Sequence, residues 1–379
     1  MNEQTNPSNI TQKPVPLTQL YFYLTEGCNL ACRHCWLSPK LQTQNNNLAS
    51  LPVEIFRSIV DQAIPLGLKS VKLTGGEPLM HPAIYEILEI ISDLRLGLII
   101  ETNGVLCTKN LAAKIASLKT PFVSISLDGA NAETHEWVRG IPGCFDSALN
   151  GIRNLVEAGI KPQIIFTLMQ YNRTQIESVV QLAENLDAHS VKFNIVQPTG
   201  RGENLTLTGE TLQVEELIEI NRWISEILSP KTKIKLYFDI PAAFRSLSKM
   251  FGLNGDGCAS CAILNILGVL SDGSYALCGV GTHTPELVFG HAGAQRLQDV
   301  WNENPVIVEL RNGIPSKFEG ICSRCHMKRV CRASCIAQNY YRYKSLWNPF
   351  WFCEEAFNKG LFPPTREIAF FGGVTQPRT

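Results

Sequence analysis

Between about residues 20 and 230, short segments rich in β-branched residues alternate six times with longer amphipathic segments. The six expected strands are residues 20–25, 70–75, 96–102, 122–128, 162–168 and 190–196. Parallel strands need a crossover that covers the sheet face, so this alternation predicts a parallel α/β sheet. Six units fit an open or partial (β/α)6 barrel better than the complete barrel of eight. In either form, functional side chains are expected at the carboxyl ends of the strands.

The alternation stops around residues 229–235, and the remaining sequence is irregular and rich in Gly and Cys. Within it, residues 269–280 predict a β-hairpin that turns at Ser271, Asp272 and Gly273. Because this region has few long apolar helices, it buries little core of its own, and bound metal clusters would supply cross-links. The predicted organisation is a flexible N-terminal tail (1–17), a barrel (18–235), a linker (236–256) and a small irregular cysteine-rich α+β domain (257–379).

Charge and hydropathy exclude several partners. The chain has 34 Lys and Arg against 34 Asp and Glu, so it has no general field that would attract nucleic acid or an anionic membrane. The first seventeen residues are polar and lack the apolar core of a secretory signal. No run approaches the roughly 18 apolar residues of a spanning helix. We therefore expect a soluble, cytoplasmic protein with neither a nucleic-acid nor a membrane partner.

Thirteen cysteines are the compositional outlier. In a reducing compartment, so many cysteines indicate metal or redox chemistry rather than structural disulfides. Two of them, Cys107 and Cys144, stand apart and are expected to be ordinary packing residues. The other eleven fall into an early trio and a late group of eight: Cys28, Cys32, Cys35, Cys258, Cys261, Cys278, Cys322, Cys325, Cys331, Cys335 and Cys353.

The early trio follows the first strand in the segment TEGCNLACRHCW, with the spacing Cys-x3-Cys-x2-Cys. Three thiolates on one short loop can bind one face of a cubane iron–sulfur cluster and leave the fourth iron without a protein ligand. A structural zinc site is the alternative, and it usually requires a fourth ligand. His34 is adjacent, but its place between Cys32 and Cys35 makes simultaneous ligation awkward. The trio alone therefore favours iron–sulfur over zinc without deciding between them.

Three further strand ends carry polar or glycine-rich motifs. The second strand ends in TGGEP (74–78), where the glycine pair opens the backbone to a ligand. The third ends in TNG (102–104) and the fourth in SISLDG (124–129). Each motif alone is ordinary turn chemistry. The four motifs together, in this order at successive strand ends, form a highly specific pattern.

In these motifs the sequence resembles the radical S-adenosylmethionine (SAM) superfamily over about residues 18–230. The resemblance implies a 4Fe–4S cluster on Cys28, Cys32 and Cys35, with SAM chelating the open iron through its amino and carboxylate groups. One electron from the reduced cluster then cleaves SAM, and the resulting 5′-deoxyadenosyl radical removes a hydrogen atom from a substrate C–H bond.

The resemblance also implies the residues that contact SAM. Gly75, Gly76 and Glu77 would receive the methionyl amino group, Ser126 would bond the ribose, and Arg139 would face the carboxylate. Asn103 belongs to the matching TNG turn. At His34 the family usually has an aromatic residue beside the adenine, and an imidazole can still stack there. Residues 197–202, after the sixth strand, would line the SAM pocket or form a plain loop.

The late cysteines suit zinc ribbons or iron–sulfur clusters equally well by spacing alone. Over about residues 257–355, however, the array resembles the SPASM domain of peptide maturases. That resemblance implies two auxiliary 4Fe–4S clusters, for a total of three. Eight thiolates would leave no open iron, which favours electron relay over substrate ligation; without Cys258, one iron would be open. The implied ligand sets are Cys258, Cys261, Cys278 and Cys335, and Cys322, Cys325, Cys331 and Cys353.

By resemblance, the expected activity is radical modification of a ribosomally made peptide, giving a cross-link, an epimerisation or a backbone excision. The alternatives are modification of a small cofactor precursor such as a tetrapyrrole, an iron–sulfur electron carrier, and a zinc-stabilised interaction protein. Expected partners are the peptide or protein substrate, a separate leader-binding protein, and a one-electron reductant such as flavodoxin or ferredoxin. Cys107 or Cys144 would be a hydrogen donor in the epimerisation case.

Overall fold

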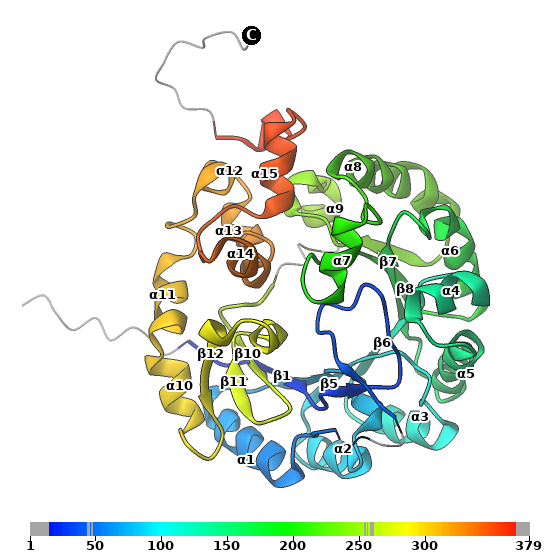
Figure 1. Cartoon of the computed structure of the whole chain (residues 1–379), viewed down its shortest axis with the longest axis vertical. Helices are drawn as coiled ribbons and strands as arrows, with labels where there is room; N and C mark the ends of the chain where they lie inside the picture. The colour runs from blue at the N-terminus through cyan, green and yellow to red at the C-terminus, as the bar shows by residue number, and fades with distance from the viewer. Residues whose placement is uncertain are drawn as a thin grey trace, which may run out of the picture.

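One ten-stranded sheet organises the molecule (Figure 1). The computed structural model describes residues 15–43, 46, 48–253, 255, 257 and 261–368. The strands of the ten-stranded sheet are β1 (Gln19–Tyr23), β4 (Ser70–Thr74), β5 (Gly97–Thr102), β6 (Pro121–Ser126), β7 (Gln163–Leu168), β8 (Ser190–Ile195), β9 (Lys235–Phe238), β10 (Ile266–Val269), β11 (Ser274–Ala276) and β12 (Val288–His291). Strands β2 (Gly27–Cys28) and β3 (Lys40–Leu41) form a separate two-stranded sheet.

The helices alternate with the central strands and then follow one another in the C-terminal third. They are α1 (Val53–Ala63), α2 (Ile84–Asp93), α3 (Lys109–Ala116), α4 (Ala132–Arg139), α5 (Cys144–Glu157), α6 (Ile176–Asn185), α7 (Arg201–Leu207), α8 (Val214–Trp223), α9 (Leu247–Phe251), α10 (Leu297–Glu303), α11 (Pro305–Gly313), α12 (Gly320–Ser323), α13 (Lys328–Cys331), α14 (Ile336–Tyr343) and α15 (Trp351–Asn358). None of these described helices has the length and apolar character needed to cross a membrane.

The strands lie in the order β12-β11-β10-β1-β4-β5-β6-β7-β8-β9. Every neighbouring pair from β10 to β9 is parallel, whereas β10, β11 and β12 are antiparallel. The sheet curves with helices α1 to α6 around its outside, and its edge strands β12 and β9 do not close it (Figure 1). The predicted α/β partial barrel is confirmed, and all six expected strands lie within two residues of their predicted limits.

Local sequence explains the outer helices. In α1 the buried residues Phe56, Ile59, Val60 and Ala63 recur every three or four positions, so one stripe of the helix faces the sheet. Helix α4 begins where the Asn131 side chain accepts a hydrogen bond from the amide of Thr134. It ends where Gly140 takes the left-handed conformation at φ 75°. These two caps fix the last turn of α4 beside the strand ends.

Strands β9 and β10 extend the sheet beyond the predicted six. Strand β9 pairs with β8 and includes residues 236–238, which the sequence had assigned to the linker. The expected hairpin forms from β10 and β11, with the Gly273 amide donating to the Leu270 carbonyl. Strand β10 then pairs with β1. Neither short strand is followed by an amphipathic helix, so the alternating pattern did not identify them. The proposed domain limits stay a prediction.

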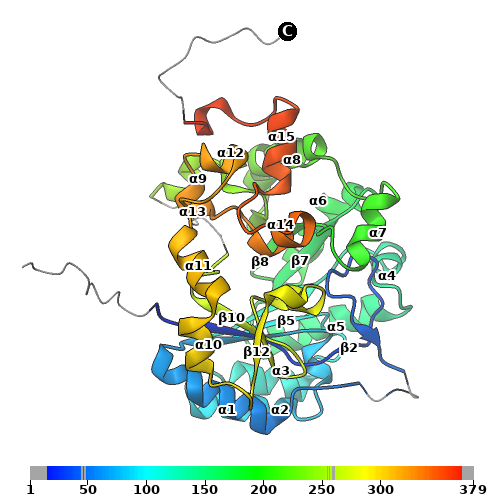
Figure 2. The ribbon, with the colours of Figure 1, turned by 60° about the vertical axis from the view of Figure 1, so that its left-hand side comes forward.

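The main core runs through both the barrel and the C-terminal third. Leu267, Tyr275, Trp301 and Phe352 pack in the same buried cluster as the strands and helices of the barrel. The indole of Trp301 donates to the carbonyl of Val15, which also ties this third to the start of β1. Elsewhere, in the part of this third that the structure describes, the apolar clusters are small, and they contain the late cysteines other than Cys258. Figure 2 shows helices α12 to α15 of this third beside α8 and α9, whereas its strands β10 to β12 belong to the sheet itself.

Candidate active site

A cavity of about 950 Å³, including its open mouth, lies at the carboxyl ends of the parallel strands. We call it the central cavity. Side chains from the ends of β4, β5, β6, β7 and β8 line it, together with the loop after β1 and the end of α4. It also contains every residue that the sequence predicted for the SAM site: Cys28, Cys32, His34, Cys35, Gly75, Gly76, Glu77, Asn103, Ser126 and Arg139.

The loop that carries the early trio is held from two sides. The amide of Ala31 donates to the carbonyl of Arg139, and the amide of Arg33 donates to the carbonyl of Val138. From the other side, the guanidinium of Arg201 donates to the Cys32 carbonyl at 2.7 Å. The loop is therefore fixed between α4 and α7, which keeps the three thiols at the wall of the central cavity.

Burial raises the pKa of the Cys28 and Cys32 thiols above the ordinary value. Both side chains pack with Leu30 and Cys144 in a small apolar cluster beside the cavity. A buried thiol remains protonated unless a cation stabilises its thiolate. Iron ions would supply that positive charge, so the environment of the trio suits a metal cluster.

The Gly75-Gly76 pair packs directly on the cysteine loop. The amides of Gly76 and Glu77 donate to the carbonyls of Thr25 and Gly27, at 3.1 and 3.0 Å. Gly75 has φ 128°, and a Cβ on Gly76 would lie only 1.8 Å from the Gly27 oxygen. The glycines thus allow two backbone segments to approach. Among the described residues, no donor bonds the carbonyl oxygens of Gly75 and Gly76, so these oxygens are the groups left for an ammonium.

Replacing Gly76 by alanine should therefore disrupt the cysteine loop. The clash is with backbone, so we expect the free energy of unfolding to fall by about 1–3 kcal/mol and SAM binding to weaken. Chemical denaturation and equilibrium dialysis with SAM would measure both effects. Gly159→Ala is the control for the clash: a Cβ there would face open space, while the positive φ of Gly159, which Gly76 lacks, adds backbone strain without a clash. Equal SAM affinity in the two variants would contradict this role of Gly76.

Glu77 connects two of the motifs. Its carboxylate is almost fully buried and accepts hydrogen bonds from the Thr102 hydroxyl at 2.6 Å and the Asn103 amide at 2.8 Å. Burial raises the pKa of this carboxyl group, although these bonds and the one from Leu79 oppose the shift. The Asn103 side chain in turn donates to Asn29 at 2.7 Å. Glu77 therefore clamps the TNG turn, which positions the loop beside Cys28.

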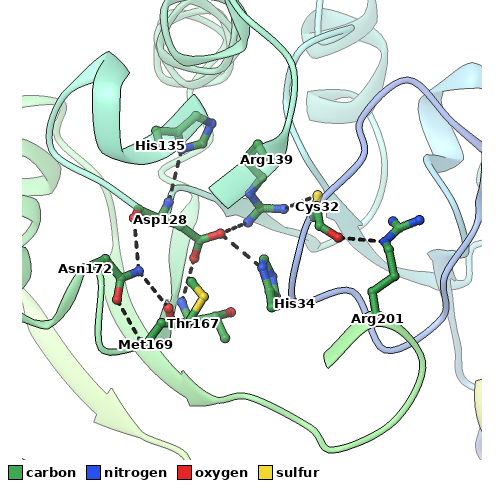
Figure 3. Close-up of polar contacts among 9 residues, drawn as sticks. All are labelled: Cys32, His34, Asp128, His135, Arg139, Thr167, Met169, Asn172 and Arg201. Atoms are coloured by element: carbon green, nitrogen blue, oxygen red, sulfur yellow. Dashed lines mark hydrogen bonds and ion pairs between the residues drawn. The ribbon is translucent and has the colours of Figure 1, made fainter. Parts of the chain in front are cut away.

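Asp128 forms a second buried network at the end of β6 (Figure 3). Its carboxylate has no exposed surface, accepts a hydrogen bond from the Thr167 amide at 2.7 Å, and pairs with Arg139 Nη2 at 2.6 Å. Arg139 Nη1 lies 3.5 Å from Cys32 Sγ. The guanidinium was predicted to face the SAM carboxylate; the structure places it between a buried carboxylate and a trio thiol.

His34 is the neutral member of this network. Its Nε2 lies 3.8 Å from Asp128 Oδ2. Burial lowers the pKa of His34 to about 4, because desolvation of the imidazolium outweighs the attraction of Asp128. A neutral imidazole at the cavity wall is suited to stacking or to accepting a hydrogen bond, and not to binding an anion as a cation.

Four residues of the central cavity carry buried polar atoms without a hydrogen-bond partner in the part of the chain that the structure describes. The atoms are His34 Nδ1, Arg139 Nε, Asn194 Oδ1 and Arg201 Nη2. Buried polar groups without partners are rare in folded proteins. Their concentration at one cavity indicates that a polar ligand completes them. Both donors and an acceptor are present, which fits a zwitterionic, hydroxylated molecule such as SAM.

The late cysteines divide into two spatial groups. In the first, burial and then Cys335 raise the pKa of Cys261 to about 12, and Cys278 is raised in the same way. In the second, burial and the other three members raise the pKa of Cys353. The two groups contain the described members of the ligand sets that the SPASM resemblance implies, and the ligand sets themselves stay a prediction. Cys258 lies outside the described residues. The second group consists of Cys322, Cys325, Cys331 and Cys353.

No group of three or more His, Cys, Asp or Glu side chains within the described ranges is close enough to hold a single metal ion. A zinc site needs four ligands around one ion. In a cubane cluster each thiolate binds a different iron, so its ligands stand further apart.

The model of the radical SAM superfamily matches residues 22–186, and the model of the SPASM iron–sulfur cluster-binding domain matches residues 258–326. The AdoMet-dependent heme synthase of Methanosarcina barkeri is 31% identical over 333 residues, which cover 84% of this chain and 90% of that relative. The chain belongs to the radical SAM superfamily. It is an enzyme that uses SAM and 4Fe–4S clusters, and it carries a C-terminal SPASM region.

This radical SAM enzyme is also similar to a maturase and to two solved structures. The mycofactocin maturase of Mycolicibacterium smegmatis is 28% identical over 338 residues, covering 86% of this chain and 79% of that relative. Streptococcus suis SuiB bound to S-adenosylmethionine has a TM-score of 0.68 at 20% identity, covering 89% of this chain and 77% of that chain. Native anSMEcpe with bound AdoMet has a TM-score of 0.65 at 18% identity, covering 91% and 98%. At these identities the two structures support the fold alone.

Sequence reasoning missed two residues of the site, Asp128 and Asn194, and left the role of a third, Arg201, open. Asp128 was read only as part of a motif, because nothing local indicates that it pairs with Arg139. Asn194 lies at the end of β8, where strand alternation alone could have placed it in the cavity. Arg201 belongs to the segment 197–202, for which both a pocket-lining and a plain-loop role were open; Gln197 and Arg201 do line the cavity.

Proposed function

We propose that this radical SAM enzyme modifies a ribosomally made peptide. Bound to the early trio, a 4Fe–4S cluster with SAM would supply the 5′-deoxyadenosyl radical that removes a hydrogen atom from the substrate. The chain's own part is to hold SAM against the trio, to keep water out, and to position the peptide at the mouth of the central cavity. The two late cysteine groups would hold two auxiliary clusters, for a total of three.

The charged groups of the central cavity favour a peptide as the substrate. Of the cavity's two arginines, Arg139 pairs with Asp128, and Arg201 donates to the backbone of the cysteine loop, while Arg139 Nε and Arg201 Nη2 have no partner among the described residues. Among the lining residues, Glu101 has the accessible carboxylate, with 39% of its side chain exposed. Lys72 pairs with Oε1 of this carboxylate, which leaves Oε2 as an acceptor for the substrate. The N–H donors of a peptide segment can pair with Oε2, whereas a substrate carboxylate, which only accepts, cannot.

Two similarities support the same choice. SuiB, whose fold this chain shares, has also been solved bound to its precursor peptide SuiA. Mycofactocin maturases match most of this chain. A cross-link, an epimerisation and a backbone excision all remain compatible with the cavity. A one-electron reductant of the flavodoxin or ferredoxin type and a separate leader-binding protein would be the partners.

A tetrapyrrole substrate is the second candidate. The observation in its favour is the 31% identity to a heme synthase over most of both chains. The Fe-coproporphyrin III synthase of Methanosarcina barkeri also matches, at 26% identity over 90% of this chain and 89% of that relative. The carboxylates of such a substrate would have to enter a cavity in which the exposed Glu101 carboxylate is one of the lining groups.

Anaerobic incubation of the reconstituted, dithionite-reduced enzyme with SAM and peptides encoded beside its gene separates these candidates. We expect 5′-deoxyadenosine together with a mass change in a peptide. Loss of two hydrogens would identify a cross-link, deuterium uptake from solvent an epimerisation, and loss of a residue-sized fragment an excision. Parallel incubation with iron coproporphyrin is the comparison. Turnover of the porphyrin with every peptide unchanged would contradict the proposal.

A further inference from the structure

Glu101 is the one acidic group of the central cavity that the cofactor site does not explain. It is the residue before the last of strand β5, beside the TNG turn, and lines the same cavity as the early trio. Its Oε1 accepts from Lys72 Nζ at 2.6 Å, whereas Oε2 bonds no group among the described residues. The carboxylate therefore combines a fixed position with one oxygen that is open to the cavity.

Lys72 holds Glu101 from the neighbouring strand. In the register of the sheet Lys72 pairs with Ile99, so it lies one pleat below Glu101 on the same face. Its ammonium sits over the ring of Tyr21 on β1, 4.8 Å from the centroid. Only 17% of the Lys72 side chain is exposed. The aromatic ring and the sheet thus fix the cation, and the cation fixes Oε1.

The other titratable groups of the cavity already have interactions within the protein or would bind the cluster. The Glu77 carboxylate is buried in its bonds to the TNG turn, and His34 is held beside Asp128. The two arginines are cations and cannot accept a proton. The trio thiols would bind iron. This leaves Glu101 as the carboxylate that a substrate in the cavity can touch.

We propose that Glu101 is the proton acceptor for the peptide substrate, and that Lys72 is the positioning residue that holds it. The inference rests on the proposed function. In the step, an N–H, O–H or S–H bond of the substrate breaks and an O–H bond forms on Glu101 Oε2. The electron pair stays with the substrate, and no electron is transferred. The proton then leaves to solvent through the open mouth of the cavity.

The charges around Glu101 keep its carboxyl group ionised. Burial opposes its ionisation, but the ammonium of Lys72 and then that of Lys192 on β8 outweigh this effect, so the pKa of Glu101 lies below its ordinary value. Asp239 after β9 and the two tyrosines of β1, Tyr21 and Tyr23, also face it. At neutral pH the group is a carboxylate that can accept a proton.

The test compares Glu101→Gln with the wild type on a peptide that the wild type modifies, and scores modified peptide and 5′-deoxyadenosine separately. We expect product formation to fall by about 10²- to 10⁴-fold, and 5′-deoxyadenosine release to fall far less, so that the ratio of the two collapses. A merely structural loss would lower both together. The matched control is Glu157→Gln, which removes the charge from an exposed pair with Lys109 and should keep the wild-type ratio.

The Lys72→Met variant is a second, independent test of the proposal. Without the ammonium, the pKa of Glu101 should rise, because burial is then no longer outweighed by the Lys72 charge. Product formation requires the deprotonated carboxylate, so the acid limb of its pH profile should lie at higher pH in the variant than in the wild type. SAM affinity, measured by equilibrium dialysis at neutral pH, reports whether the variant cavity is intact.

The outcomes are distinct. If the wild type modifies a peptide and Glu101→Gln does so at the same rate, or loses both products in parallel, the proton-acceptor role is wrong and the proposed function stands. An unchanged pH profile in Lys72→Met would also overturn it. If the wild type cleaves SAM but modifies no peptide, the proposed function fails and this inference fails with it.

Discussion

The Cys32→Ala variant is expected to release no measurable 5′-deoxyadenosine. Its thiol is the middle member of the trio, is almost fully buried, and lies against the guanidinium of Arg139. A cubane held at only two corners would have two irons without a protein ligand, so we expect the cluster to be lost rather than weakened. Iron content should fall by about four atoms per chain. Iron analysis, the EPR signal of the reduced protein and chromatography of the reaction would measure these effects.

Cys107→Ala is the matched control for this variant. Cys107 is as deeply buried as Cys32, but it packs in the main core and does not line the central cavity. Its removal should cost some stability and leave the iron content unchanged. If Cys32→Ala kept its full iron complement and cleaved SAM at the wild-type rate, the trio would not be the SAM-cluster site.

Asp128→Asn is expected to have the largest effect on stability. Asparagine keeps the shape of the side chain and can still accept the Thr167 amide, but it removes the charge that balances Arg139. Breaking a buried ion pair on one side leaves an uncompensated charge, which costs about 3–5 kcal/mol. Anaerobic denaturation should show this loss in the free energy of unfolding. The Cys32 side of the cavity should loosen as well, because Arg139 loses its fixed position.

The difference in the free energy of unfolding between the wild type and Asp128→Asn depends on pH in a way set by the direction of the Asp128 pKa shift. Burial alone would raise the pKa of Asp128, but Arg139 and then His34 hold it below the ordinary value. The stabilisation is therefore complete above about pH 4, the pKa of an unfolded aspartate. It is lost only as the pH falls through the lower folded value.

A surface aspartate gives the control for Asp128→Asn. Asp61 pairs with Arg57 on the exposed face of α1, and Asp61→Asn should change the free energy of unfolding by no more than about 0.5 kcal/mol. The wild type and Asp128→Asn should differ by a constant amount between about pH 5 and pH 8. Equal stability of the two proteins across that range would show that Arg139 has another anionic partner.

The cofactor site and the proposed acid–base group divide the cavity between them. The trio, the glycine pair and the Asp128 network form the side on which SAM would bind. Glu101 forms a second side, and Lys72 and Tyr21 hold it from behind without lining the cavity. Burial and then Cys261 of the first late group raise the pKa of Tyr21.

Much of the site was readable in the sequence because its motifs are local. Cys28, Cys32 and Cys35 lie on one loop, and the TGGEP, TNG and SISLDG segments each end a strand. Once the strands are parallel, their carboxyl ends must share one edge, and the motifs meet in the central cavity. The alternation of barrel strands and helices is also a local sequence pattern. For that reason the limits of the six predicted strands agree with the structure to within two residues.

What the sequence by itself determined is therefore the kind of chemistry: three thiols on a loop, at the mouth of a parallel sheet. The tertiary structure decided the rest, because the deciding contacts join residues far apart in the chain. The ion pair of Lys72 with Glu101 depends on strand register, and β10 reaches β1 across more than 240 positions. Burial of Asp128 against Arg139 depends on how α4 packs on the sheet. Desolvation and pairing of charges are properties of packing, and no local pattern carries them.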